Sequence, residues 1–190
     1  MRIKICGITR PEDARFAEEA GADAIGTVLF SASRRSVRPE KAQEIFRAVG
    51  PFTTTVAVTH TRSEQELKEI IALNPDAIQI SHPFVFGSPP GPRVIRMIGR
   101  GDALLEDCDA VIVDESHGKG RQFDPLYARG IVERSRIPVI LAGGLTPGNV
   151  GRAIREIQPY AVDVASGVEV SPGIKDHGKI RAFIAACRDR

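Results

Sequence analysis

The sequence has few aromatic residues, with no tryptophan and two tyrosines among its 190 residues, and it has only three cysteines. Cys6, Cys108 and Cys187 are widely spaced and form no Cys-x-x-Cys motif, which gives no basis for a disulfide framework or a cysteine-based zinc site. The chain contains no apolar run long enough to cross a bilayer. Its first ten residues, MRIKICGITR, lack the apolar core of a signal peptide. We therefore expect a cytoplasmic protein.

Strong net charge is also missing. The formal net charge of +2 is too small to predict binding to nucleic acid or to a membrane surface. His60 and His82 lie near no second histidine or carboxylate with the spacing of a metal site, so no metal is expected. With 42% hydrophobic and 26% charged residues, the composition is typical of a globular domain. We expect one domain that spans residues 1–190.

Short apolar runs alternate with helix-like segments about eight times along the chain. The predicted strands are residues 3–6, 24–30, 53–58, 77–80, 93–98, 110–113, 139–142 and 161–165. The predicted helices are residues 11–20, 39–49, 63–73, 124–134, 149–157 and 176–186. No glycine-rich dinucleotide motif follows the first strand, which disfavours a doubly wound nucleotide-binding fold. The alternation predicts an α/β protein of the (β/α)8 TIM-barrel class.

The barrel is expected to be compact, because 190 residues is short for a fold that usually takes about 200 to 250. Residues 81–92 contain four prolines and two glycines, so no ordinary helix fits after the fourth strand. Residues 31–38 and 115–122 are expected to be polar loops, and residues 103–107 leave room for one helical turn after the fifth strand. We therefore expect the chain to be short because the segments after strands four and five lack full helices.

Two turns of small residues follow the last two predicted strands. Gly143 and Gly144 follow one, and Ser166 and Gly167 follow the next. Such turns can lie side by side and direct backbone N–H groups at one anion, as the last two loops of a (β/α)8 barrel do with a phosphate. The alternative is that these glycines only permit tight turns.

The strand ends supply two candidates for proton transfer. Cys6 ends the first predicted strand, either as a small buried side chain or as a thiolate base. Asp114 follows the sixth strand, either as a helix cap or salt-bridge partner or as an acid that retains its proton by desolvation. Strands one and six lie on roughly opposite sides of a closed barrel, so the two groups can flank a substrate. That arrangement suits an isomerisation.

Other strand-end residues are candidates for binding. Arg34 and Arg35 are either solvated surface charges or a clamp for a carboxylate or phosphate. Asp163 lies within an apolar strand, where an unpaired carboxylate is costly, so it is expected to meet the substrate or an internal partner. Gln79, near the end of strand four, is a further candidate, whereas His60 and His82 are read as ordinary loop residues.

These motifs resemble those of the phosphoribosylanthranilate isomerase family over nearly the whole chain. The matching segments are KICGIT (4–9), RPEDA (10–14), GADAIG (21–26), SRR (33–35), PE (39–40), GKGRQFD (118–124), LAGGLTPGNV (141–150), VDVASGVE (162–169) and PGIKD (172–176). The resemblance implies a (β/α)8 barrel that converts N-(5-phosphoribosyl)anthranilate to 1-(2-carboxyphenylamino)-1-deoxyribulose 5-phosphate in tryptophan biosynthesis. This is an Amadori rearrangement, catalysed by an aldose–ketose isomerase without a cofactor or metal.

The resemblance also implies roles for single residues. Asp114 is the general acid at the ribose ring oxygen, Cys6 is the base that removes the C2 proton, and Arg35 meets the anthranilate carboxylate. Gln79 and Asp163 match substrate-binding positions. Backbone N–H groups hold the phosphate at four small residues: Gly143, Gly144, Ser166 and Gly167. The only partner implied is the small phosphosugar substrate, and the protein is expected to be a monomer or a homodimer.

The sequence departs from the family pattern at several positions. The family usually has proline where Arg34 stands, and Val-Phe-Val-Asn where residues 58–61 read VTHT. Gln-Leu-His-Gly becomes QISH at residues 79–82, which displaces the histidine, and Gly-Thr-Gly becomes GKG at residues 118–120. The alternatives are another phosphosugar barrel, such as a histidine-pathway or dual-substrate isomerase or indole-glycerol-phosphate synthase, and a non-catalytic barrel that binds a phosphate ligand.

Overall fold

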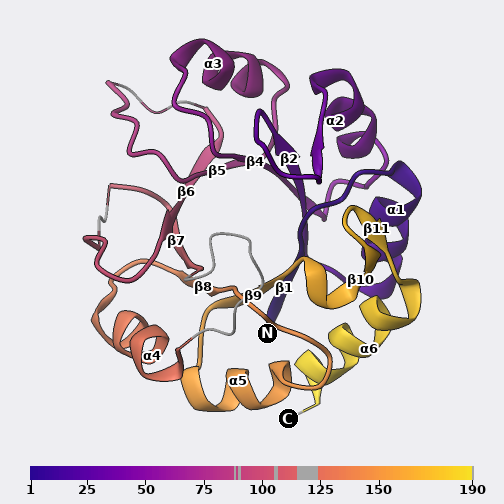
Figure 1. The fold of residues 1–190 in the computed structure, drawn as a ribbon, viewed down its shortest axis with the longest axis vertical. Helices are drawn as coiled ribbons and strands as arrows, with labels where there is room; N and C mark the ends of the chain where they lie inside the picture. The colour runs from indigo at the N-terminus through magenta and orange to yellow at the C-terminus, as the bar shows by residue number, and fades with distance from the viewer. Residues whose placement is uncertain (88, 90, 105–106, 115–123, 190) are drawn as a thin grey trace.

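Eight parallel strands close a barrel in the computed structural model, which describes residues 1–87, 89, 91–104, 107–114 and 124–189. The strands are β1 (Arg2–Ile5), β2 (Ala24–Leu29), β4 (Thr54–Thr59), β5 (Ala77–Ile80), β6 (Arg93–Ile98), β7 (Ala110–Val113), β8 (Val139–Leu141) and β9 (Ala161–Val164). Each pairs with its neighbour in the chain, and β1 pairs with both β2 and β9, so the ring closes (Figure 1). The predicted (β/α)8 fold is confirmed.

Helices form the outer layer around this ring (Figure 1). They are α1 (Pro11–Ala20), α2 (Pro39–Phe46), α3 (Glu64–Ala72), α4 (Pro125–Arg134), α5 (Val150–Ile157) and α6 (His177–Arg188). Ser63 caps α3, because its side chain accepts a hydrogen bond from the Glu66 N–H. Proline begins α1, α2 and α4, where its fixed φ suits the first helical turn. In the described part of the chain, no helix is both long and apolar enough to span a bilayer.

The core has an outer layer and an inner layer because the strands are buried on both faces. Ile3 and Ile5 of β1 join Phe183 of α6 in the outer layer, between the sheet and the helices. The inner layer lines the barrel with smaller side chains, among them Val56 and Ala77. A strand with both faces buried reads as a continuous apolar run, and this explains why the strands were recognisable in the sequence.

The structure departs from the predicted elements in several places. Strand β2 ends one residue early because Phe30 has a left-handed φ of 46°. Residues 31–38 were predicted as a loop but contain β3 (Ser36–Val37), which pairs with β2 outside the ring. The sequence analysis also missed a short 3-10 turn, η1 (Ser166–Val168), and a hairpin of β10 (Glu169–Ser171) with β11 (Ile174–Lys175).

The described residues of segments 81–92 and 99–109 contain no helix. Buried Arg96 of β6 anchors both segments, because its guanidinium donates to the Phe84 carbonyl at 2.8 Å and to the Asp107 carboxylate at 3.0 Å. The predicted helical turn at 103–107 lies partly outside the described residues. The predicted loop 115–122 and most of the GKGRQFD motif (118–124) also lie outside them.

Candidate active site

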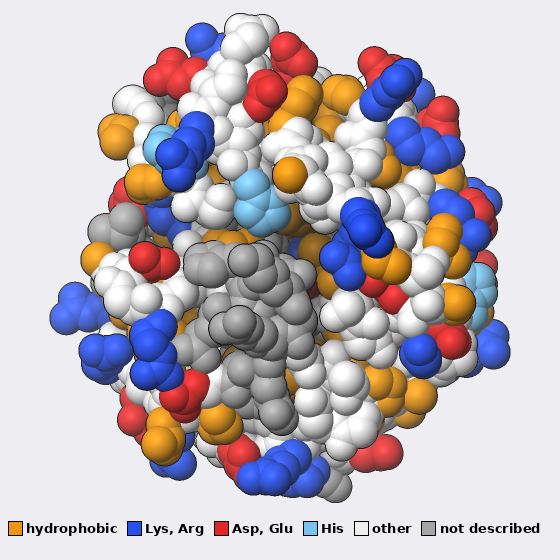
Figure 2. Space-filling view, viewed as in Figure 1, with side chains coloured by type: hydrophobic (Ala, Val, Ile, Leu, Met, Phe, Trp, Pro, Cys, Tyr) orange, Lys and Arg blue, Asp and Glu red, His pale blue; other side chains and the backbone are white. Residues whose placement is uncertain are grey.

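A cavity of about 660 Å³ opens at the carboxyl ends of the barrel strands. Among the residues that line it are five with predicted site roles: Cys6, Arg35, Gln79, Asp114 and Asp163. This is the end of a (β/α)8 barrel at which catalytic residues gather. On the face of the molecule that Figure 2 shows, acidic and basic side chains are interspersed. This mixture agrees with the small net charge.

Cys6 and Asp114 each lie just beyond the end of a strand. The backbone N–H of Cys6 donates to the Val164 carbonyl at 2.8 Å, and that of Asp114 donates to the Ile98 carbonyl at 3.2 Å. Both side chains border the cavity, although the two residues are only 7% and 8% exposed. Burial, reinforced by the negative charge of Asp163, raises the pKa of the Cys6 thiol. A largely buried thiol and a largely buried carboxyl group thus border one cavity.

Lys4 lies at the centre of the site, although it was not among the residues predicted to form it. Its side chain turns into the barrel, and its Nζ donates to Asp163 Oδ1 at 2.8 Å and to Gln79 Oε1 at 3.0 Å. Burial disfavours the charged form of Lys4, but the Asp163 carboxylate and Cys6 outweigh that penalty and raise its pKa to about 12. The signal was present in the sequence, because a lysine between Ile3 and Ile5 in a buried strand needs a partner.

Asp163 and Gln79, predicted to bind substrate, both hold Lys4. Asp163 was expected to meet either the substrate or an internal partner. The structure shows an internal partner, Lys4. Register explains the contact, since Asp163 of β9 lies directly opposite Lys4 of β1. Both acceptors also line the cavity, so they form part of its floor.

Arg35 lies in the loop after β2 and forms a bidentate ion pair with Glu169. Its Nε and its terminal nitrogen donate to the two Glu169 oxygens at 2.9 and 2.7 Å. Buried Lys175 donates to the same carboxylate at 3.0 Å. Burial opposes ionisation of Glu169, but the bonds from Arg35 and Lys175 prevail and lower its pKa. Glu169 was recognised only as the last residue of the motif VDVASGVE (162–169), with no role of its own. Its partner Arg35 lies 134 positions away in the chain.

The two predicted phosphate loops are adjacent in space. Gly143 and Gly144 have φ angles of 90° and 63°, which require glycine or a strained residue. A Cβ on Gly167 would lie 1.9 Å from the Leu145 carbonyl oxygen, so the turn after β9 packs directly on the loop after β8. Ala165, next to Ser166, lines the cavity, so the turn after β9 begins at its edge, although none of the four predicted phosphate residues is itself among the lining residues.

The remaining candidates separate into two groups. Arg34 and His60 line the cavity, and His60 Nδ1 lies 3.0 Å from the Ser31 hydroxyl. His82 instead packs edge-on against Phe84, with ring centroids 4.8 Å apart, and is not among the residues that line the cavity. Among the described residues, no three His, Cys, Asp or Glu side chains are grouped closely enough to bind a metal ion.

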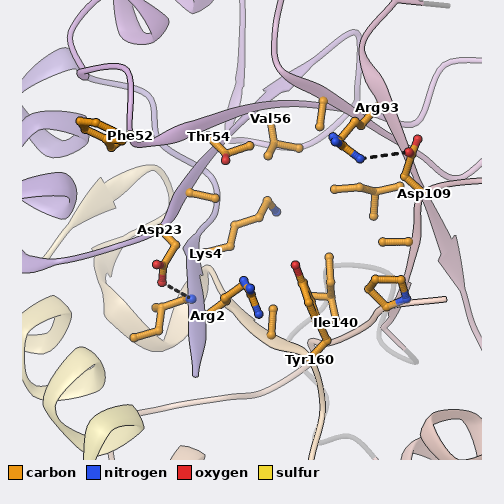
Figure 3. A pocket seen from close by; sticks show the side chains of 17 residues that line it. Arg2, Lys4, Asp23, Phe52, Thr54, Val56, Arg93, Asp109, Ile140 and Tyr160 are labelled. Atoms are coloured by element: carbon orange, nitrogen blue, oxygen red, sulfur yellow. Dashed lines mark hydrogen bonds and ion pairs between the residues drawn. The ribbon is translucent and has the colours of Figure 1, made fainter.

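A second hollow, of about 550 Å³, opens at the amino ends of the strands (Figure 3). Arg2, Arg93 and Tyr160 lie around it, and small side chains such as Ala24 and Ala161 line it. Lys4 reaches into it from β1 and so separates this hollow from the cavity at the mouth. Neither Cys6 nor Asp114 borders this second hollow.

Comparison with known proteins identifies the family. The family profile described as N-(5'-phosphoribosyl)anthranilate isomerase matches residues 3–82 and 99–186. The chain belongs to the phosphoribosylanthranilate isomerase family. A relative from Methanoregula boonei, named N-(5'-phosphoribosyl)anthranilate isomerase, is 68% identical over 190 residues, which cover 100% of this chain and 97% of that protein.

Solved members of the family share the fold. The phosphoribosyl anthranilate isomerase of Thermus thermophilus superposes with a TM-score of 0.85 at 34% identity and covers 98% of each chain. A second isomerase, crystallised with reduced 1-(o-carboxyphenylamino)-1-deoxyribulose 5-phosphate, superposes with a TM-score of 0.82 at 32% identity and covers 99% of this chain and 98% of that one. Phosphoribosylanthranilate isomerases thus match this chain from end to end.

Proposed function

We propose that this isomerase rearranges N-(5'-phosphoribosyl)anthranilate to 1-(2-carboxyphenylamino)-1-deoxyribulose 5-phosphate in tryptophan biosynthesis, with Asp114 as general acid and Cys6 as general base. The observation that carries these roles is that both side chains border one cavity, from strands on different sides of the barrel. Their enclosure favours proton transfer, because a desolvated carboxyl group and thiol exchange protons with a bound substrate rather than with water.

The reaction divides into two proton transfers. Asp114 gives its proton to the ribose ring oxygen while the C1–O bond breaks and the nitrogen lone pair forms a C1=N bond. The Cys6 thiolate then takes the proton from C2. The C–H electrons become the C1=C2 bond, and the C1=N electrons return to nitrogen to give an enolamine. Ketonisation adds a proton to C1 and removes the proton of the C2 hydroxyl, so the product is an isomer of the substrate.

Binding of the two ends of the substrate follows from the charge around the cavity. Arg35 lines the cavity and is our candidate for the anthranilate carboxylate. The N–H groups of Gly143, Gly144, Ser166 and Gly167 are our candidates for the phosphate, supported by the close packing of their two loops. Gln79 and Asp163 have a lesser role. Both accept hydrogen bonds from Lys4, and together they form the floor of the cavity beneath the sugar.

The decisive experiment follows the loss of anthranilate fluorescence with Cys6→Ser and Asp114→Asn. Each variant is expected to lose at least about a hundredfold in kcat, the scale of general acid–base catalysis. Cys108→Ser is the matched control, since Cys108 packs with the outer core and does not line the cavity. Turnover near the wild-type value in either site variant would refute the role given to that residue. The single-domain organisation over residues 1–190, the oligomeric state and the cytoplasmic location stay predictions.

A further inference from the structure

We infer that Lys4 is a positioning residue for the base: its ammonium group stabilises the thiolate form of Cys6, and the Asp163 carboxylate opposes that effect while it holds the ammonium in place. This inference rests on the proposed function only for the role of the Cys6 thiolate as general base. The arrangement of the two groups around Gly26 is a property of the protein without substrate. It assigns a task to a buried lysine that the mechanism above leaves unused.

Gly26 of β2 shows how closely the two groups meet. A Cβ built on Gly26 would lie 3.0 Å from the Cys6 sulfur, 3.0 Å from Lys4 Cε and 3.1 Å from Lys4 Nζ. The sulfur and the ammonium group therefore both lie against the same glycine. Any larger residue at position 26 would occupy the space in which they approach each other.

The surroundings of Lys4 keep its charge at this place. Asp163 and Gln79 accept two of its N–H groups on the side of the mouth, at 2.8 and 3.0 Å. On the opposite side lies the second hollow, around which Figure 3 shows the charged side chains of Arg2, Asp23 and Arg93. The ammonium group is thus held by two buried acceptors and would lose both hydrogen bonds if it moved toward the second hollow.

Four charged side chains act on Cys6 from the elements packed around it. They are Lys4 on β1, Asp163 on β9, Lys175 on β11 and Arg35 in the loop before β3. Burial and Asp163 raise the thiol pKa, whereas Lys4 and Lys175 lower it. Removal of Lys4 and removal of the Asp163 charge should therefore change the thiol pKa in opposite directions, which a purely structural role for Lys4 would not produce.

The test is the pH dependence of Cys6 alkylation by iodoacetamide in the substrate-free protein, followed by mass spectrometry of the peptide that contains Cys6. Lys4→Met keeps the length of the side chain without its charge, and should raise the midpoint by about one pH unit or more, a tenfold change in thiolate population. Asp163→Asn should lower the midpoint. Lys175→Met, which removes a buried lysine bound to Glu169 instead, should give a smaller rise.

Gly26→Ala gives a second, independent variant if Lys4→Met does not fold. Its added methyl group should force the sulfur and the ammonium apart and raise the midpoint. Gly130→Ala is the matched control, because a Cβ there meets nothing within 4 Å. An unchanged midpoint in folded Lys4→Met or folded Gly26→Ala would overturn the inference, and so would shifts of Lys4→Met and Asp163→Asn in the same direction. Failure of the proposed function would appear separately, as a fully active Cys6→Ser variant in the fluorescence assay.

Discussion

Arg35 and Glu169 join two loops at the mouth of the barrel through paired hydrogen bonds of 2.9 and 2.7 Å. The pair ties the loop after β2 to the hairpin of β10 and β11, since Glu169 opens that hairpin. A bidentate pair fixes the orientation of the guanidinium plane as well as its position. Arg35 is therefore already oriented before any substrate carboxylate arrives, which reduces the entropy lost on binding.

Arg35→Lys tests whether this orientation matters. Lysine keeps the positive charge but cannot make two parallel bonds, so we expect KM for the substrate to rise by about tenfold, or roughly 1.4 kcal/mol, with a smaller change in kcat. Steady-state kinetics by anthranilate fluorescence measures both constants. Arg129→Lys, at an exposed ion pair on α4, should leave both constants unchanged. An unaltered KM in Arg35→Lys would exclude the carboxylate contact.

Glu169 should make stability depend on acid pH. Its folded pKa lies below the usual value for a glutamate, so the folded state binds fewer protons there than the unfolded state does. Its contribution is fully present above the unfolded pKa and is lost as the pH falls through the folded pKa. Urea unfolding between pH 6 and about pH 3 should therefore show a steeper loss of stability in the wild type than in Glu169→Gln.

At neutral pH, Glu169→Gln leaves Arg35 and Lys175 without their shared carboxylate. We expect it to lower the free energy of unfolding by about 3 kcal/mol, the range for breaking a buried ion pair. Glu133→Gln, at the exposed pair with Arg129, should cost less than about 1 kcal/mol. Equal effects of the two substitutions would show that the buried cluster adds no special stability.

Gly167→Ala tests the packing of the two phosphate loops. Its new methyl group would lie 1.9 Å from the Leu145 carbonyl oxygen, a backbone atom, so one loop must move. We expect KM and the inhibition constant of inorganic phosphate to rise together by about tenfold or more, because the N–H groups no longer converge. Gly148→Ala, in the neighbouring loop, meets only Thr146 Oγ1 at 3.8 Å and is the matched control. An equal rise of these two constants in Gly167→Ala and Gly148→Ala would argue against a specific contact between the two loops.

Ser63→Ala should lower stability without affecting the reaction. The Ser63 hydroxyl accepts the Glu66 N–H at 3.3 Å at the start of α3, and loss of such a cap costs about 1 kcal/mol. Neither residue lines the cavity, so kcat should be unchanged. Urea denaturation and the fluorescence assay, carried out on the same preparation, measure the two effects. A change in kcat would mean that α3 is coupled to the site.

Much of the fold was predictable because its signals are local. Buried strands read as apolar runs, and α3, α4 and α6 are each capped by the residue just before the helix, which is Ser63, Asp124 and Asp176 respectively. The left-handed φ of Phe30 and the two-residue strand β3 escaped prediction because neither has a distinct local pattern. The hairpin after η1 escaped for the same reason, since its strands are only two and three residues long.

The sequence by itself determined the alternation of strands and helices, the order of the barrel, and the position of Cys6 and Asp114 at strand ends, because each depends on residues close together in the chain. Only the tertiary structure decided which charges meet. Lys4 contacts Asp163 across 159 positions because closure of the ring sets β1 beside β9 in a fixed register. Arg35 meets Glu169 because two loops that are remote in sequence fold over the same mouth. Such partners are chosen by geometry, and no local pattern encodes them.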